Sequence, residues 1–195
     1  MNRIIVMRFF LGFMFSLCPI AVTQSYAVNV SVTITKDQVP ANKQTQSNHY
    51  LTAKEAYKTI EQHSQEVLFV DVRTRAEVEF VGSPVLVDAL VPYLENNLSA
   101  WNHNAQRYPK TINEQFARQL AVELRNNGLN KQSPVIFICR SGGRSAQTAS
   151  LATQLGYTQT YSVVDGFEGD TAKNGLAKGQ RVINGWKNSQ LPWTY

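Results

Sequence analysis

The sequence contains very little sulfur. Its 195 residues include two cysteines and three methionines, and every methionine, together with Cys18, lies within the first 18 positions. If that stretch is a removable leader, Cys139 carries the only sulfur atom of the mature protein. A disulfide scaffold, a zinc site made of cysteines and a methionine-lined copper site each need several sulfur atoms and are excluded. The three histidines show no metal-ligand spacing, so we expect neither a metal nor another cofactor.

The first 27 residues are typical of a secretory signal peptide. Arg3 and Arg8 give a positive start, residues 9–22 are almost wholly apolar, and residues 25–27 (Ser-Tyr-Ala) form a small-x-small cleavage site. The alternative is a permanent membrane anchor, but spanning a bilayer takes about 18 or more apolar residues. We therefore expect cleavage after Ala27 and a protein that is periplasmic or otherwise exported, with no stable membrane association once the signal is removed.

Charge and length describe the part that remains. Loss of the leader lowers the formal net charge from +5 to +3, and the sequence has no run of Lys and Arg, so nucleic-acid binding is not expected. The remaining length suits one domain. We divide the chain into a signal peptide at 1–27, an N-terminal strand and linker at 28–50, and a main domain at 51–195.

Strand-like and helix-like segments alternate along the chain, which predicts a parallel α/β sheet with helices on both faces. Residues 28–35 alternate apolar and polar side chains and predict a half-buried strand, whereas the polar residues 36–49 predict a linker and 92–107 a loop. Capping boxes at Thr52–Glu55 and Thr111–Glu114 predict the starts of two helices. The apolar strands are predicted at 67–72, 85–90, 134–139 and 158–164, and a third helix at 144–155.

The residues after the most apolar strand are suited to bind an anion. Ligands bind at the carboxyl ends of strands in an open α/β sheet, and Cys139 lies at such an end. Two adjacent glycines let the loop curl so that its N–H groups face inward, and the next helix adds the positive end of its dipole. This environment favours a reactive thiolate over an inert buried thiol. The expected anion-binding residues are Arg140, Ser141, Gly142, Gly143, Arg144 and Ser145.

Three motifs together resemble a single rhodanese domain, the family of thiosulfate sulfurtransferases. They are Leu68-Phe-Val-Asp71-Val-Arg73 with Glu77, the loop Cys139–Ser145, and Val163-Val-Asp-Gly166-Phe167, and the resemblance extends over about 51–193. It implies a five-stranded parallel sheet with helices on both faces, to which the N-terminal strand would be an addition. It also implies that Cys139 is the nucleophile, that residues 140–144 cradle its persulfide, and that Arg144 neutralises a bound anion. The Asp71–Arg73 pair is more often structural in this family.

The resemblance implies an enzyme that takes a sulfane sulfur from a small anionic donor such as thiosulfate and passes it to an external thiol or to cyanide. One alternative is a non-catalytic rhodanese module that carries sulfur for a protein partner, with 93–108 as the contact surface. A cysteine-based phosphatase or arsenate reductase is disfavoured, because those enzymes use Cys-x5-Arg and this loop is Cys-x4-Arg. Two departures from the family, Gly82-Ser83-Pro84-Val85 and the insert at 93–108, leave the choice of substrate open.

Overall fold

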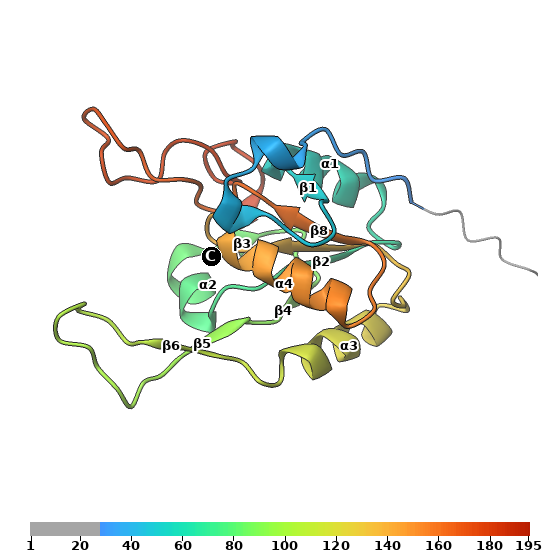
Figure 1. Cartoon of the computed structure of the whole chain (residues 1–195), viewed down its shortest axis with the longest axis horizontal. Coiled ribbons are helices and arrows are strands. Elements are labelled where there is room, and N and C mark those ends of the chain that lie inside the picture. Colours follow the sequence, from blue (N-terminus) through green and yellow to red (C-terminus); the bar gives the residue numbers. More distant parts are fainter. Residues whose placement is uncertain (1–27) are drawn as a thin grey trace, which may run out of the picture.

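The computed structural model describes residues 28–195, so the predicted signal peptide lies outside the described residues. Five parallel strands form the central sheet in the order β1-β8-β7-β2-β4 (Figure 1). The parallel α/β fold that the sequence predicts is confirmed, although the strand predicted over 85–90 is only two residues long. The strands are β1 (Tyr50–Leu51), β2 (Leu68–Asp71), β4 (Ala89–Leu90), β7 (Val135–Ile138) and β8 (Thr160–Val163).

Within residues 28–195, four α-helices accompany the sheet, with α3 and α4 on one face and α1 on the other (Figure 1). The first capping box is confirmed, because the Thr52 hydroxyl accepts a hydrogen bond from the Glu55 N–H and the Glu55 carboxylate accepts one from the Thr52 N–H. A second box, Thr74 with Glu77, starts α2. The helices are α1 (Ala53–Gln62), α2 (Arg75–Val81), α3 (Phe116–Asn126) and α4 (Gly143–Gln154).

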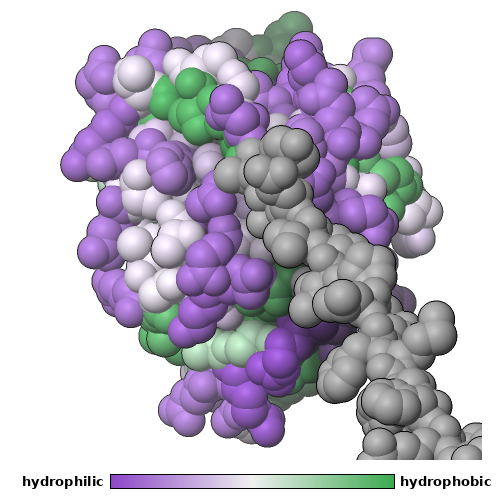
Figure 2. All heavy atoms as spheres, turned by 90° about the vertical axis from the view of Figure 1, so that its right-hand side faces the viewer, coloured by the Kyte–Doolittle hydropathy of each residue, from purple (hydrophilic) through white to green (hydrophobic). Residues whose placement is uncertain are grey.

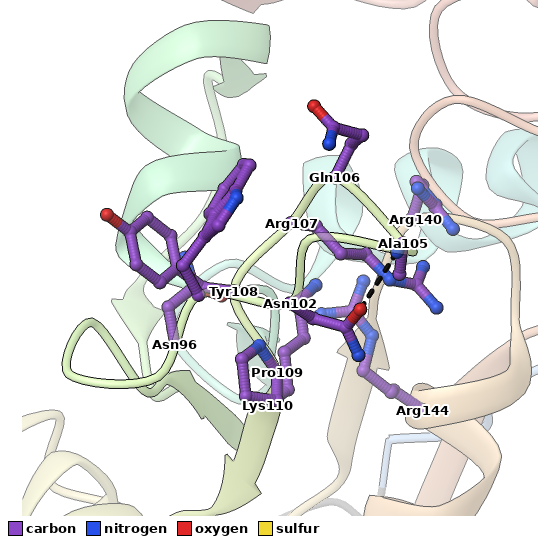
Figure 3. Close-up of a pocket in the computed structure, with 11 residues that line it drawn as sticks. Asn96, Asn102, Ala105, Gln106, Arg107, Tyr108, Pro109, Lys110, Arg140 and Arg144 are labelled. Carbon is purple, nitrogen blue, oxygen red and sulfur yellow. Dashed lines mark hydrogen bonds between the residues drawn. The ribbon is translucent and has the colours of Figure 1, made fainter.

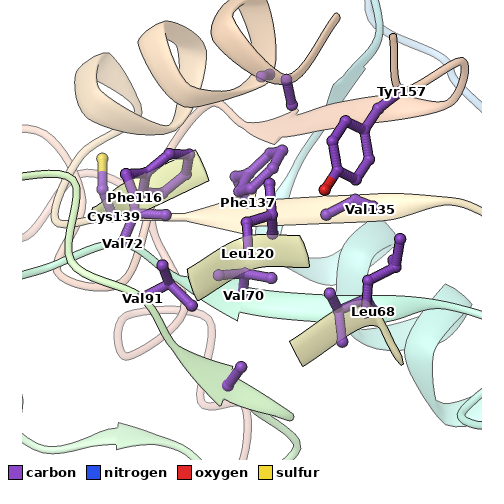
Figure 4. Packing of buried hydrophobic residues seen from close by; sticks show 14 residues of the cluster. Leu68, Val70, Val72, Val91, Phe116, Leu120, Val135, Phe137, Cys139 and Tyr157 are labelled. Carbon is purple, nitrogen blue, oxygen red and sulfur yellow. The ribbon is translucent and has the colours of Figure 1, made fainter. Parts of the chain in front are cut away.

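Side chains alternate across the sheet and build one apolar layer on each face. On β2, Leu68 and Val70 point to the layer under α3 and α4, whereas Phe69 belongs to the layer under α1. Figure 4 shows the first layer, where Phe116 and Leu120 of α3 pack against the strands and Cys139 lies at one end. The thiol therefore sits where the core meets the carboxyl ends of the strands.

A buried ion pair fixes the turn after β2. Asp71 and Arg73 are both fully buried, with 2.6 Å between Arg73 Nη2 and Asp71 Oδ2. The Arg73 guanidinium also donates to the Gly82 carbonyl and lies 4.2 Å from the centre of the Phe167 ring. These contacts tie the end of β2 to the C-terminal end of α2 and to Phe167, which are the surroundings of a structural pair.

The strand predicted over residues 28–35 is wrong. These residues form no strand, although Val30 is buried against the layer under α1 and Thr33 hydrogen-bonds Glu55 on that helix. Alternation reports which side chains are buried, but a strand also needs a neighbour that supplies its backbone hydrogen bonds. This segment packs on a helix through its side chains and pairs with no strand.

The linker predicted over residues 36–49 is also wrong. It contains two short 3-10 helices, η1 (Lys36–Gln38) and η2 (Ala41–Lys43), and η2 packs against α4. Lys43 is 8% exposed, and its Nζ lies 2.7 Å from Asp170 Oδ1 and 3.0 Å from the Val164 carbonyl oxygen. This ion pair attaches the N-terminal segment beside the cysteine loop.

The loop predicted over residues 92–107 belongs to a hairpin, and within this range only Leu94–Asn96 form a strand. Its strands β5 (Leu94–Asn96) and β6 (Lys110–Ile112) pair antiparallel. Thr111 lies in β6, so the capping box predicted at Thr111–Glu114 is wrong. Instead Gln115 is the N-cap of α3, and the Asn113 side chain accepts from its backbone N–H. Cross-strand hydrogen bonds therefore outweigh the local capping signal.

The C-terminal segment packs back onto the domain. Trp186 is fully buried under α1, and β9 (Trp193–Thr194) pairs with β3 (Ser83–Pro84). Residues 170–185 extend from the body on the same side as the hairpin (Figure 1). On the opposite side hydrophilic residues predominate, with hydrophobic ones scattered between them (Figure 2). Among residues 28–195, no helix has the length and apolar character needed to cross a membrane.

The buried pair gives a test of the fold. Asp71→Asn removes the charge that compensates Arg73, and we expect it to lower the free energy of unfolding by about 3–5 kcal/mol. Glu95→Gln is the matched control, because Glu95 pairs with Arg75 at the surface and its loss should cost no more than about 1 kcal/mol. Urea unfolding at neutral pH measures both variants. Equal stability of the two would contradict a structural role for the pair.

Candidate active site

Cys139 lies directly after β7, at the start of a loop that curls around its sulfur. The residue is 2% exposed, and the Gly142 N–H donates a hydrogen bond to Sγ over 3.2 Å. Gly142 has φ 94°, a left-handed conformation that glycine adopts without strain, and α4 begins at the next residue. The loop therefore turns back over the thiol before it enters the helix.

The loop offers several backbone donors near the thiol. Within residues 28–195, the N–H groups of Arg140, Ser141, Gly143 and Arg144 donate no hydrogen bond to another group. The last two belong to the first turn of α4, where N–H groups have no partner inside the helix and the helix dipole is positive. This arrangement has the donors and the field that an anion nest requires.

Ser145 lies behind the thiol. It is fully buried, its Oγ is 3.5 Å from Cys139 Sγ, and it is 2.9 Å from the Gly142 carbonyl oxygen, to which it donates. The Ser162 hydroxyl donates to Ser145 Oγ in turn, over 3.2 Å. The sequence predicts Ser145 as a donor to a bound anion, but these contacts give it the role of holding the loop around the sulfur.

Arg144 is anchored by Glu77 from α2. Its guanidinium donates two hydrogen bonds to the carboxylate, over 2.6 and 2.7 Å, and both side chains are mostly buried. Burial raises the pKa of Glu77, but the hydrogen bonds and positive charge of Arg144 outweigh it and hold the pKa well below its ordinary value. Lys110 of β6 also contacts this carboxylate, over 3.2 Å. Glu77 thus joins the cysteine loop to the hairpin.

A hollow of about 310 Å³ opens onto the sulfur. It includes two residues that the sequence reasoning missed, Asn42 and Gln147. Gln147 follows Arg144 by three positions on α4, so helical spacing could have indicated it. No local signal marks Asn42, because a segment distant in sequence brings it to the site. The lining residues are Asn42, Cys139, Arg140, Ser141, Gly143, Arg144 and Gln147.

The motif Val163–Phe167 supports the cysteine loop from behind. The Phe167 N–H donates to the Cys139 carbonyl over 2.8 Å, and a Cβ on Gly166 would come within 2.5 Å of the Ser141 nitrogen. The Asp165 carboxylate accepts from the Ala53 N–H over 2.8 Å and from the Gly185 N–H over 3.3 Å. Burial raises the pKa of Asp165 to about 6, although these hydrogen bonds act to lower it.

No group of three or more His, Cys, Asp or Glu side chains within the described part of the chain is arranged to hold a metal ion. The chemistry that the geometry offers is nucleophilic: one thiol in a ring of backbone donors, with two arginines at its rim.

The chain is similar to known proteins in both sequence and fold. Residues 52–173 match the model of the rhodanese-like domain. The crystal structure of Rv0390 from M. tuberculosis is 33% identical and covers 75% of this chain and 96% of that one, with a TM-score of 0.55. The predicted fold is therefore confirmed. The match to the family model ends at residue 173, before β9. The C-terminal segment that packs back onto the domain therefore lies beyond the part that the family model covers.

Two further relatives were found. The uncharacterized protein RC0915 of Rickettsia conorii is 31% identical over 130 residues, which cover 65% of this chain and 81% of that protein. The polysulfide-sulfur transferase of Wolinella succinogenes is 21% identical and covers 82% of this chain and 85% of that one, with a TM-score of 0.45. The latter likeness is too weak to bear on function.

The Glu77–Arg144 pair predicts a pH-dependent stability. Glu77→Gln should lower the free energy of unfolding by about 1.5–3 kcal/mol at neutral pH, because the buried guanidinium loses a charged acceptor. The folded-state pKa of Glu77 is depressed, so its contribution is complete above the ordinary value of 4.5 and is lost as the pH falls below it. Denaturant unfolding at about pH 7, 5 and 3 should show the difference from wild type shrinking at the lowest pH.

Glu79→Gln is the matched control for this measurement. Glu79 is exposed on the same helix and forms no ion pair within residues 28–195, so its loss should change stability by less than about 0.5 kcal/mol at each pH. A constant difference between Glu77→Gln and wild type across this pH range would contradict the pairing.

Proposed function

The chain belongs to the rhodanese-like domain family, and from this membership we propose that it is a sulfurtransferase in which Cys139 carries sulfane sulfur as a persulfide. The family supports sulfur transfer as the general chemistry. The specific assignment rests on the hydrogen bond that the Gly142 N–H donates to Cys139 Sγ. The neighbouring N–H groups of this loop have no other partner among the described residues. These donors are placed to hold the negative charge of an anionic persulfide.

Sulfur loading follows from this geometry. The Cys139 thiolate attacks the outer sulfur of a small anionic donor such as thiosulfate, and a new S–S bond forms at Sγ. The S–S bond of the donor breaks, and sulfite leaves with the electron pair. The N–H groups of residues 140–144 cradle the transferred sulfur, and Arg140 and Arg144 attract the donor to the hollow that they line.

Sulfur release needs a second molecule. Cys139 is the only cysteine or methionine in residues 28–195, so no second thiol of this part of the chain attacks the persulfide. An external thiol or cyanide takes the outer sulfur, and the electron pair of the broken S–S bond returns to Cys139 Sγ as a thiolate. The cycle leaves the protein unchanged and involves no net oxidation of Cys139.

The loop length supports sulfur transfer over phosphate-ester hydrolysis. Cys139 to Arg144 spans Cys-x4-Arg, and the resulting hollow is small, about 310 Å³. The shorter ring of N–H groups resembles the sulfurtransferase branch, because a phosphate ester calls for the longer Cys-x5-Arg loop. A protein without catalysis, which only carries sulfur for a partner, remains the second candidate because two long segments flank the site (Figure 1).

Sulfur loading tests the proposal directly. The full chain with Cys18→Ser, in which Cys139 is the only thiol, should gain the mass of one sulfur atom on incubation with thiosulfate. Addition of cyanide should then remove that mass and yield thiocyanate over repeated cycles. The matched control is the same chain with Cys139→Ala, which should do neither. Loading without turnover would favour the carrier, and no loading, or equal loading in the control, would refute the proposal.

We also propose that the protein acts after export, on the basis of residues 1–27. Expression in a Gram-negative cell, followed by N-terminal sequencing of the protein from the periplasmic fraction, should give a chain that starts at Val28. Alteration of the cleavage site by Ala27→Leu should leave the precursor uncut. A mature chain that still begins at Met1 in the wild type would contradict signal cleavage.

A further inference from the structure

A cleft of about 810 Å³ lies between the tip of the hairpin and the cysteine loop (Figure 3). Its volume falls within the usual range for small-molecule sites and exceeds what thiosulfate needs. Four of the lining side chains are basic and none is acidic, and the edge-to-face pair Trp101–Tyr108 adds an aromatic wall. The basic residues are Arg107, Lys110, Arg140 and Arg144.

Two of these cations have no counter-ion in the described structure. Lys110 and Arg144 share the Glu77 carboxylate, but Arg107 and Arg140 form no ion pair within residues 28–195. Figure 3 shows the side chains of Arg107, Arg140 and Arg144 directed toward the same end of the cleft. Because two of these guanidinium groups have no carboxylate partner, this part of the cleft attracts a ligand with more than one negative charge.

The hairpin tip holds Arg107 in a defined place. Asn102 and Arg107 pair antiparallel, with N–H to O distances of 3.0 and 3.3 Å, and the Asn102 side chain accepts from the Ala105 N–H over 2.8 Å (Figure 3). The backbone of Arg107 is therefore fixed by the loop itself. The ordered backbone directs the Arg107 side chain to the cleft, where its guanidinium can bind a carboxylate in the bidentate mode that Arg favours.

The cleft also adjoins the hollow that contains the reactive sulfur. Arg140 and Arg144 line both the cleft and the smaller hollow that contains Cys139. The cleft and the hollow are therefore adjacent, and a ligand of the cleft lies next to the site of the reactive sulfur.

We propose that this cleft binds the sulfur acceptor, a low-molecular-weight thiol that bears at least two carboxylates, and this inference rests on the proposed persulfide chemistry. Arg107 and Arg140 bind the carboxylates, and Trp101 with Tyr108 contacts the apolar part of the molecule. The acceptor thiolate attacks the outer sulfur, the bond between that sulfur and Cys139 Sγ breaks, and the electron pair returns to Sγ. The acceptor leaves as a persulfide, with no oxidant or reductant consumed.

Two acceptors with the same skeleton provide the test. Mercaptosuccinate carries two carboxylates, and its dimethyl ester carries none. We expect Arg107→Gln to lower kcat/KM for mercaptosuccinate about tenfold or more, as for the loss of a charge-assisted hydrogen bond, and to change kcat/KM for the diester less than about twofold. Succinate, which lacks the thiol, should compete with mercaptosuccinate in the wild type and compete less well in the variant.

Lys178→Gln is the matched control, because it removes one exposed positive charge from the other extended segment, 170–185. It should leave the ratio of the two acceptors unchanged. Equal effects of Arg107→Gln on mercaptosuccinate and on the diester, or equal effects of the two variants, would refute the acceptor site. Failure of the wild type to load sulfur would refute the proposed function itself. Measurement of the protein mass before any acceptor is added detects this outcome, and so distinguishes it from a failure of the acceptor site alone.

Discussion

The curvature of the cysteine loop depends on a close contact between two backbones. A Cβ on Gly142 would lie 2.0 Å from the Val164 carbonyl oxygen, and one on Gly166 would lie 2.5 Å from the Ser141 nitrogen. Without side chains at these two positions, the loop after β7 and the loop after β8 lie directly against each other. This contact brings the Gly142 N–H onto Cys139 Sγ and sets the start of α4. Neither strand end could supply this geometry alone, so the anion nest is a product of two neighbouring loops.

Much of the fold follows from local patterns in the sequence. Apolar runs identify the buried strands because a parallel strand is covered on both faces. The capping box at Thr52 succeeds because nothing competes with it, whereas the one at Thr111 fails because that residue pairs across the hairpin with Glu95. Residues 28–35 show the same limit: their alternation reports the burial of Val30 but does not reveal whether a strand lies beside them. Local sequence signals therefore mislead at positions where pairing between distant segments determines the structure.

Part of the candidate site can likewise be predicted from the sequence, and part of it cannot. Residues 139–145 and Glu77 are visible in the sequence because the residue types and spacing suit an anion nest and a family motif. Asn42 is not visible, because contacts with residues distant in sequence bring it to the hollow, among them the Lys43–Asp170 ion pair, which joins positions 127 residues apart. Ser145 belongs to the first turn of α4, and only the structure reveals that its hydroxyl lies 3.5 Å from the sulfur. A motif gives the identity of functional residues more readily than the direction in which each side chain points.

The positively charged residues around the site fall into two groups, those paired with a carboxylate and those without one. Glu77 pairs with two cations, Arg144 beside the thiol and Lys110 on the hairpin, and offsets one of their two positive charges. Its depressed pKa keeps it ionised through the neutral range. It therefore fixes the position of Arg144 while reducing the net charge next to the sulfur. Arg107 and Arg140 form no ion pair within the described residues, so the part of the cleft that they line attracts anions. Because residues 28–195 contain no second thiol, the cycle that we propose needs an external acceptor, and in this proposal the hairpin recognises the acceptor while the cysteine loop carries the sulfur.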